Sequence, residues 1–199
     1  MNIAILCSGN GTNLQAIVDN VNNGHIPAGI ALVLSDEKNA FALGRAKKAG
    51  IETIVLDKKD YKTREDFDRA AVKHLKKKNV ELVVLAGFMR LLSPYFVREY
   101  KNRIINIHPA LLPSFKGAHG IKDAIDHGVK VTGVTVHFVD EHLDDGPIIL
   151  QRAVEIKEGD TEETLLERLH KEEHRIYPEA IKLFVEGKIK VEGRKVVKQ

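Results

Sequence analysis

Residues 2–21 read NIAILCSGNGTNLQAIVDNV, and this stretch decides the fold class. Its apolar run at Ile3–Leu6 predicts a short buried strand, which ends in a Gly-rich turn. After the turn, apolar residues recur at the spacing of one helix face, at Leu14, Ile17, Val18 and Val21, which predicts a helix from Thr12 to Val21. A strand that runs through a tight turn into a helix is the unit from which α/β folds are built.

The same alternation continues along the chain. Short apolar runs predict strands over residues 30–34, 54–56, 81–86, 103–107, 130–139 and 147–156. Helical periodicity predicts helices over residues 40–49, 64–78, 121–126 and 161–184, the last with Thr161 as its N-cap. Continuous apolar strands between helices indicate a Rossmann-like α/β fold, with a mostly parallel, twisted sheet covered by helices on both faces.

The composition is that of one ordinary globular domain. A chain of 199 residues that is 43% hydrophobic can bury a core of useful size. No stretch approaches the ~18 apolar residues of a membrane helix, and the N-terminus lacks the basic region of a signal peptide. The single cysteine, Cys7, cannot form an internal disulfide. We therefore expect a cytoplasmic protein without a membrane partner.

The net charge of +3 is concentrated near the C-terminus. Residues 182–199 carry six basic and two acidic side chains, which leaves residues 1–181 with a net charge of −1. This distribution does not indicate a cationic groove for nucleic acid, so no nucleic-acid partner is expected. The chain divides into one domain over residues 1–188 and a basic tail over residues 189–199.

In parallel α/β sheets, ligands bind beyond the carboxyl ends of the strands, so the loops there are the candidate sites. The loop at residues 7–13 has glycines for a tight turn and amides at a helix N-terminus, which could hold a phosphate. Two alternatives remain open. The loop is a plain turn, or it is a dinucleotide site with Asp36 on the ribose, although Leu14 stands where a third glycine is needed.

A second candidate site follows the strand at residues 103–107. Period-two geometry puts Asn106 and His108 on the same face near the carboxyl edge. An amide can donate to a developing oxyanion, and an imidazole can move protons near neutral pH. The Pro- and Gly-rich loop at residues 110–120 is either a lid or a plain connection. An aspartate from the acidic turn at residues 140–147 could reach His108 and stabilise its imidazolium.

Four motifs occur together in one order. They are Ser8–Gln15 (SGNGTNLQ), Leu85–Arg90 (LAGFMR) followed by Leu92-Ser93-Pro94, Asn106–Pro113 (NIHPALLP) and Leu143–Pro147 (LDDGP). With them the chain resembles the folate-dependent phosphoribosylglycinamide formyltransferase family over nearly its whole length, from Met1 to about Lys188. The resemblance implies the formyltransferase fold and a transferase of purine (IMP) biosynthesis. Its reaction moves a formyl group from 10-formyltetrahydrofolate to the amine of 5′-phosphoribosylglycinamide.

The resemblance also implies roles for individual residues. The catalytic residues are Asn106, His108 and Asp144, and the substrate-binding residues are Gly11, Thr12, Asn13 and Glu173. The folate-binding residues are Arg64, Met89, Arg90, Leu91, Leu92, Asn106, Asp140, Glu141, His142 and Leu143. Thr12 stands where the family more often has Ser, and His170 where it often has Gln. The co-substrate is 10-formyltetrahydrofolate, no metal is required, and the expected state is a monomer or homodimer.

The sequence also allows hypotheses in which the protein has a different kind of function. Residues 170–174 spell His-x-x-Glu-His, a zinc-peptidase pattern that puts His170 and His174 on one helical face. Four further histidines form a weak metal-binding set and are expected mostly on the surface or in loops: His119, His127, His137 and His142. A nucleotide-binding Rossmann module without catalysis is the binding-protein alternative. Among related enzymes, methionyl-tRNA formyltransferase and formyltetrahydrofolate hydrolase usually carry a further domain, for which this length leaves no room.

Overall fold

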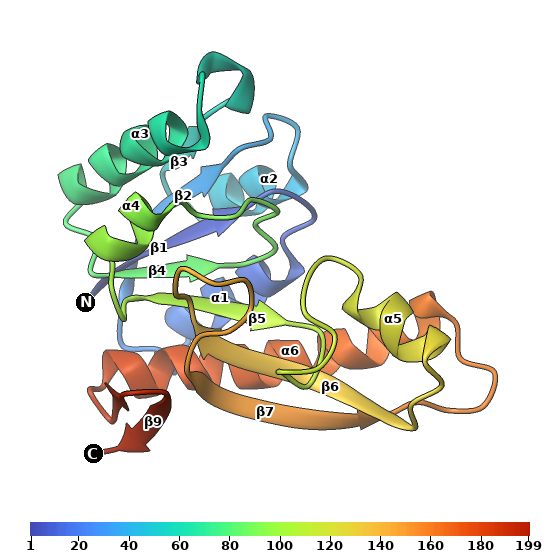
Figure 1. Ribbon diagram of the computed structural model, residues 1–199. Coiled ribbons are helices and arrows are strands. Elements are labelled where there is room, and N and C mark those ends of the chain that lie inside the picture. The colour runs from blue at the N-terminus through green and yellow to red at the C-terminus, as the bar shows by residue number, and fades with distance from the viewer.

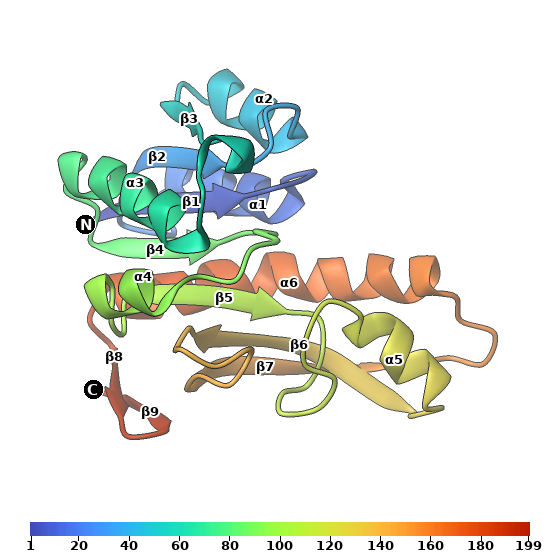
Figure 2. The ribbon, with the colours of Figure 1, turned by 45° about the horizontal axis from the view of Figure 1, so that its top comes forward.

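A computed structural model describes residues 1–199 and shows one sheet of nine strands. Their order is β3-β2-β1-β4-β5-β6-β7-β9-β8 (Figures 1 and 2). The strands span β1 Asn2–Cys7, β2 Gly29–Ser35, β3 Thr53–Val55, β4 Leu82–Leu85, β5 Ile104–His108, β6 Val131–Phe138, β7 Ile148–Glu155, β8 Ile189–Glu192 and β9 Lys195–Lys198. The first five strands in the sheet order are parallel. β6 is antiparallel to both β5 and β7, whereas β7 is parallel to β9, and β9 is antiparallel to β8. The predicted α/β fold with a mostly parallel sheet is confirmed.

Helices cover both faces of this sheet. They span α1 Thr12–Asn22, α2 Phe41–Lys48, α3 Arg64–Lys77, α4 Pro94–Glu99, α5 Gly120–Asp126 and α6 Glu162–Val185, with a short 3-10 helix, η1, at Lys58–Asp60. In β1, Ile3 and Ile5 pack into a core with α1 and α6, while Ala4 and Leu6 pack into a core with α3 and α4. The alternation of strand side chains therefore supplies two cores, one on each face.

Four elements were not predicted from the sequence: the short η1, helix α4 and the C-terminal strands β8 and β9. Helix α4 begins at Pro94, a residue suited to the first helical position, and Ser93 caps it by accepting from the Phe96 amide. At six residues it is too short to show a periodic pattern. The C-terminal residues form a hairpin, β8–β9, which joins the sheet through one backbone pairing between Lys195 and Ile148 of β7 (Figure 2).

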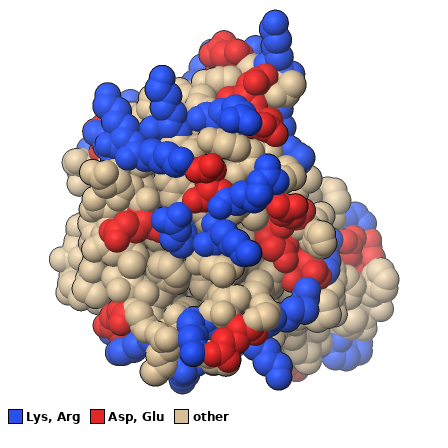
Figure 3. Space-filling view, turned by 60° about the vertical axis from the view of Figure 1, so that its left-hand side comes forward, with Lys and Arg blue, Asp and Glu red and all other residues tan.

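The surface charges are mixed rather than separated. On the face shown in Figure 3, Lys and Arg side chains lie interspersed with Asp and Glu. Some of these charges pair between elements, such as Lys76 of α3 with Glu99 of α4, and Arg98 with Glu141 at 3.7 Å. No helix of the structure combines the length and the apolar character that crossing a membrane requires.

Candidate active site

A cavity of about 490 Å³ opens beyond the carboxyl ends of β4 and β5. Its walls come from segments far apart in the chain: the start of α3, the loop after β4, the end of β5, part of the long loop before α5, and the loop after β6. All ten residues expected to contact folate and all three expected to be catalytic line it: Arg64, Met89, Arg90, Leu91, Leu92, Asn106, His108, Asp140, Glu141, His142, Leu143 and Asp144. The fold therefore brings this whole set together in a space of the size that small ligands occupy.

Strand β5 presents the amide and the imidazole at the cavity. Its residues Ile105 and Ile107 are buried in the core that contains α1 and α6, so Asn106 and His108 project to the opposite face. His108 is only 4% exposed. Asn106 pairs in register with His137 on the antiparallel strand β6. The strand thus holds both polar side chains at its carboxyl end, beside the cavity.

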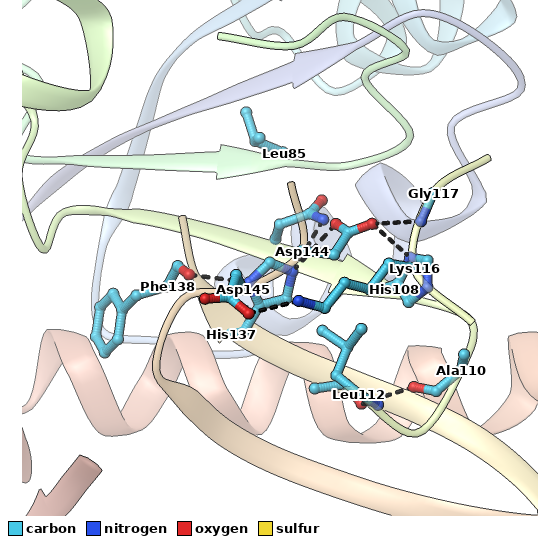
Figure 4. A network of polar contacts seen from close by, with 12 residues as sticks. Leu85, His108, Ala110, Leu112, Lys116, Gly117, His137, Phe138, Asp144 and Asp145 are labelled. Carbon is cyan, nitrogen blue, oxygen red and sulfur yellow. Dashed lines mark hydrogen bonds and ion pairs between the residues drawn. The ribbon is translucent and has the colours of Figure 1, made fainter. Parts of the chain in front are cut away.

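Both ring nitrogens of His108 face oxygen acceptors, of which Figure 4 shows the Asp144 carboxylate. Its Nδ1 lies 3.5 Å from Oδ2 of Asp144, and its Nε2 donates to the Phe115 carbonyl at 2.8 Å. An imidazolium, which carries a hydrogen on each nitrogen, satisfies both acceptors at once. The ring is therefore placed as a proton donor, with one proton held by a residue of the loop at 110–120.

Asp144 sits in a backbone conformation that few residues other than glycine adopt. Its φ is +47°, in the left-handed region. The side chain is 10% exposed, and its Oδ2 accepts from the Gly117 amide at 2.9 Å. Contacts from the surrounding loops therefore hold Asp144 beside His108.

His137 is a site residue that the sequence did not identify. The expectation that the four spare histidines lie mostly in loops or on the surface is met by the exposed His119, His127 and His142. His137 is the exception that this expectation allowed for, since it is 1% exposed. The signal that could have found it is its place on β6, directly opposite Asn106.

The contacts of His137 orient the Asn106 amide. Its Nδ1 lies 2.9 Å from the Phe138 carbonyl and must donate to it, which leaves Nε2 to accept from Asn106 Nδ2 at 3.2 Å. Burial lowers the pKa of His137, which favours this neutral form. Oδ1 of Asp144 lies 3.7 Å from the same Nε2. One N–H of Asn106 is thereby held by His137, and the other is left for a ligand.

The first half of the loop at residues 110–120 is fixed to the sheet. Thr135 Oγ1 donates to the Ala110 carbonyl at 2.6 Å and accepts from the Leu112 amide at 3.1 Å. A Cβ on Gly133 would lie 2.0 Å from the Arg152 carbonyl oxygen of β7 and 2.6 Å from Leu111 Cδ2, so this position requires glycine and the loop packs closely over it. The second half of the loop contacts the site itself, through Phe115 and Gly117.

The four residues expected to bind phosphoribosylglycinamide form a second group, around the start of α1. Gly11 has a φ of +78°, and a Cβ there would lie 2.7 Å from that of Ala42, so both the backbone and the space require glycine. No side chain caps α1, whose first residues are Thr12 and Asn13. Glu173 of α6 is 5% exposed and accepts from Asn13 Nδ2 at 2.9 Å. Two distant elements thus meet beside an uncapped helix N-terminus.

Ser8 links the Gly-rich loop to the cavity wall. Its hydroxyl donates to Oδ1 of the buried Asp36 at 2.6 Å and accepts from the Met89 amide at 2.9 Å. Asp36, which offered a possible ribose contact, is instead engaged inside the protein. This linking role of Ser8 depends on the tertiary structure, because it requires the loops after β1, β2 and β4 to lie together.

In α6, the residues of the His-x-x-Glu-His pattern contact one another and helix α1. The rings of His170 and His174 stack with an interplanar angle of 9°. The carboxylate between them, Glu173, is bonded to Asn13. No group of three or more His, Cys, Asp or Glu side chains has the geometry of a metal site.

Comparisons with a family model and with known proteins point to the same family. The family model described as Formyl transferase matches residues 1–181. Phosphoribosylglycinamide formyltransferase of Escherichia coli is 44% identical over 96% of this chain and 90% of its own length. The corresponding protein of Bacillus subtilis is 44% identical over 90% of this chain and 92% of its own.

Longer relatives and solved structures extend the comparison. The trifunctional purine biosynthetic protein adenosine-3 of Gallus gallus is 48% identical over 95% of this chain, which spans 19% of that relative's length. The crystal structure of glycinamide ribonucleotide transformylase 1 from Symbiobacterium toebii superposes with a TM-score of 0.98 at 50% identity. That match covers 100% of this chain and 93% of the other.

Proposed function

The chain belongs to the formyl transferase family, and we propose that it moves a formyl group from 10-formyltetrahydrofolate to the amine of 5′-phosphoribosylglycinamide. It is an enzyme of purine biosynthesis, like the two bacterial relatives that match at least 90% of this chain and of their own length. The observation that carries the proposal is the convergence of Asn106, His108 and Asp144 on one wall of the cavity. Its partners are small-molecule substrates.

The chemistry follows from the groups on that wall. The substrate amine attacks the formyl carbon, and the carbonyl oxygen becomes a tetrahedral oxyanion. The free N–H of Asn106 and the His108 imidazolium stabilise this charge. The carbon–N10 bond then breaks, N10 takes a proton from His108, and the attacking nitrogen passes a proton to the now neutral imidazole, which restores the imidazolium. Asp144 orients the ring throughout and stabilises its charged form before and after the transfer.

The proton on His108 Nε2 has to be released before it can reach N10. In this structure the Phe115 carbonyl accepts it, and the φ of Phe115 is +51°, an unfavourable conformation for a residue other than glycine. We propose that the second half of the 110–120 loop gives up this hydrogen bond when the substrates bind. The first half stays anchored through Thr135.

The phosphoribosyl end of the substrate is assigned to the start of α1. The amides at Gly11–Asn13 and the positive end of the helix favour a phosphate group, and the Thr12 hydroxyl adds a donor. Glu173 offers a carboxylate to the glycinamide amine. Ser8 joins this loop to Met89 at the cavity, so the two substrate sites are directly connected.

The folate is assigned to the cavity. Met89, Leu91 and Leu143 are between 49% and 77% exposed at its edge, which is unusual for apolar side chains unless a ligand covers them. Arg64 lies at the cavity wall for the carboxylates of the glutamate tail. Arg90 stacks on the Phe67 ring at 4.2 Å, and its buried Nε has no protein partner.

A formyl-transfer assay with and without phosphoribosylglycinamide tests this function. Tetrahydrofolate is expected to form only when the amine substrate is present, with one formylated product per folate. Folate turnover that does not need the amine would identify a hydrolase instead. Binding titrations with NAD or ATP, compared with a folate analogue, distinguish the nucleotide-binding alternative.

A further inference from the structure

The C-terminal hairpin contacts the loop that carries Asp144. Arg194 lies in the turn between β8 and β9. Its Nη1 donates to Oδ2 of Asp145 at 2.9 Å, and its Nη2 donates to the Asp145 backbone carbonyl at 2.9 Å. One planar guanidinium thus holds both the side chain and the main chain of the residue after Asp144.

A lysine holds Asp145 from the other side. Lys116 Nζ lies 2.5 Å from Oδ1 of Asp145, and the next residue, Gly117, donates its amide to Asp144 (Figure 4). Hydrogen bonds from Lys116 and Arg194 lower the pKa of Asp145 to about 2. Asp145 therefore stays ionised at neutral pH and keeps both cations.

The hairpin packs on the core through Ile189, Val191 and Val196, and its hydrogen bonds to this loop come from Arg194. One backbone pairing joins β9 to β7. A cavity of about 450 Å³ lies between the hairpin and the loop, and its lining includes Asp144, Asp145, Arg194 and Lys195. The bonds of Arg194 cross this groove and join the hairpin to Asp145.

We propose that Arg194 is a positioning residue for formyl transfer. It acts through Asp145 to keep Asp144 in its left-handed conformation and against His108. This inference rests on the proposed function and extends it to a residue outside the part of the chain that the family model matches, residues 1–181. It gives the basic C-terminal segment a role in the reaction.

The test is the steady-state kinetics of Arg194→Gln, Arg194→Lys and the control Lys190→Ala. Lys190 lies on the same hairpin and pairs with Glu192 at 2.7 Å. We expect Arg194→Gln to lower kcat by about 10-fold with little change in either KM, because Arg194 is not a lining residue of the substrate cavity. Arg194→Lys should recover part of the loss, and Lys190→Ala should match the wild type. Unchanged kcat in Arg194→Gln would overturn the proposal.

A double-mutant cycle separates positioning from general stabilisation. In an Asp144→Asn background, Arg194→Gln should lower kcat by less than about twofold further, because its target is already lost. If Arg194→Gln lowers kcat by the same factor in the Asp144→Asn background as in the wild type, the two residues act independently and the proposal is overturned. If Arg194→Gln fails to fold, Asp145→Asn provides the same cycle with a side chain of equal size. If the wild-type protein shows no formyl transfer, the proposed function is refuted. If the wild type is active but the two substitutions lower kcat independently, only the role of Arg194 is refuted.

Discussion

Among the individual residues, the three at the cavity wall depend on one another. His108 takes its orientation from Asp144 and the Phe115 carbonyl, and Asn106 takes its orientation from His137. Each functional group is therefore held by a second polar group that substrate need not touch. A side chain that is oriented in advance loses little freedom when the oxyanion forms.

Asp144→Asn tests the central pair. The amide keeps the shape of the side chain but loses the charge that stabilises the His108 imidazolium, so we expect kcat to fall by on the order of 10²-fold. His108→Ala should have an effect at least as large. Both are measured by formyl-transfer kinetics on folded protein. The control is Asp126→Asn, because Asp126 pairs only with Lys122 on α5. Near-normal turnover in either variant would remove that residue from the mechanism.

Buried His137 predicts an acid sensitivity of the fold. Burial holds its pKa below the usual value of 6.5, so the unfolded chain binds a proton more readily than the folded one. The stability that neutral His137 allows is complete above about pH 6.5 and declines as the pH falls below that value.

Urea unfolding at about pH 7.5 and about pH 5.5 measures this effect. Wild type should lose more free energy of unfolding on acidification than His137→Gln, which has no titrating group there. His174 also has a pKa lowered by burial and adds to the loss in both proteins. Substitution of the exposed His127 serves as control. Equal losses in wild type and His137→Gln would contradict the assignment.

Among the elements, the β1–loop–α1 unit forms the end of the site to which we assign the substrate phosphate. The loop turns through Gly11, packs against Ala42 of α2, and leaves the start of α1 without a capping side chain. Arg45 of α2 donates to the Asn10 carbonyl at 2.9 Å and fixes the loop from outside. The geometry of this unit is thus decided by helix α2 as well as by its own residues.

Gly11→Ala is expected to disturb this unit strongly. The added Cβ meets Ala42 at 2.7 Å in a left-handed backbone, so we expect a loss of about 1–3 kcal/mol in free energy of unfolding and a raised KM for phosphoribosylglycinamide. Denaturant unfolding and kinetics measure the two effects. Gly9→Ala is the matched control for stability, since nothing lies within 4 Å of a Cβ there. Equal stability of the two variants would show that the loop shifts freely.

For the molecule as a whole, the central strands are the most protected part. β1 lies between β2 and β4 with a core on each face, and Cys7 at its end is fully buried. Burial, with a further effect from the Asp36 charge, raises the pKa of the Cys7 thiol to about 12. The thiol is thus both inaccessible and protonated in the folded protein.

Thiol labelling of Cys7 therefore reports global unfolding. We expect native protein to react with a thiol reagent only at the rate of global opening, and to react at once in ~6 M guanidinium. Destabilising the protein by Gly11→Ala should speed labelling about tenfold for each ~1.4 kcal/mol lost in free energy of unfolding, when reclosing is faster than labelling. Fast labelling of the native protein would show that β1 opens locally.

The sequence alone determines which segments form strands or helices and where most of them lie. This is possible because apolar periodicity, glycine turns and capping residues act over a few neighbouring residues. The strand at Ile3–Leu6, the helix from Thr12 and the cap at Thr161 are of this kind. The motifs also identified Asn106, His108 and Asp144 as one candidate set, and the fold places them together.

Only the folded chain decides which distant residues support that set. His137 joins it through antiparallel pairing of β6 with β5, Ser8 through the meeting of three loops, and Arg194 through the docking of a hairpin about 50 positions further along the chain. No local pattern encodes these contacts, since each depends on strand register and packing across the sheet. The left-handed backbone of Asp144 has the same origin, because it is stabilised by contacts from Gly117 and from the residues that hold Asp145.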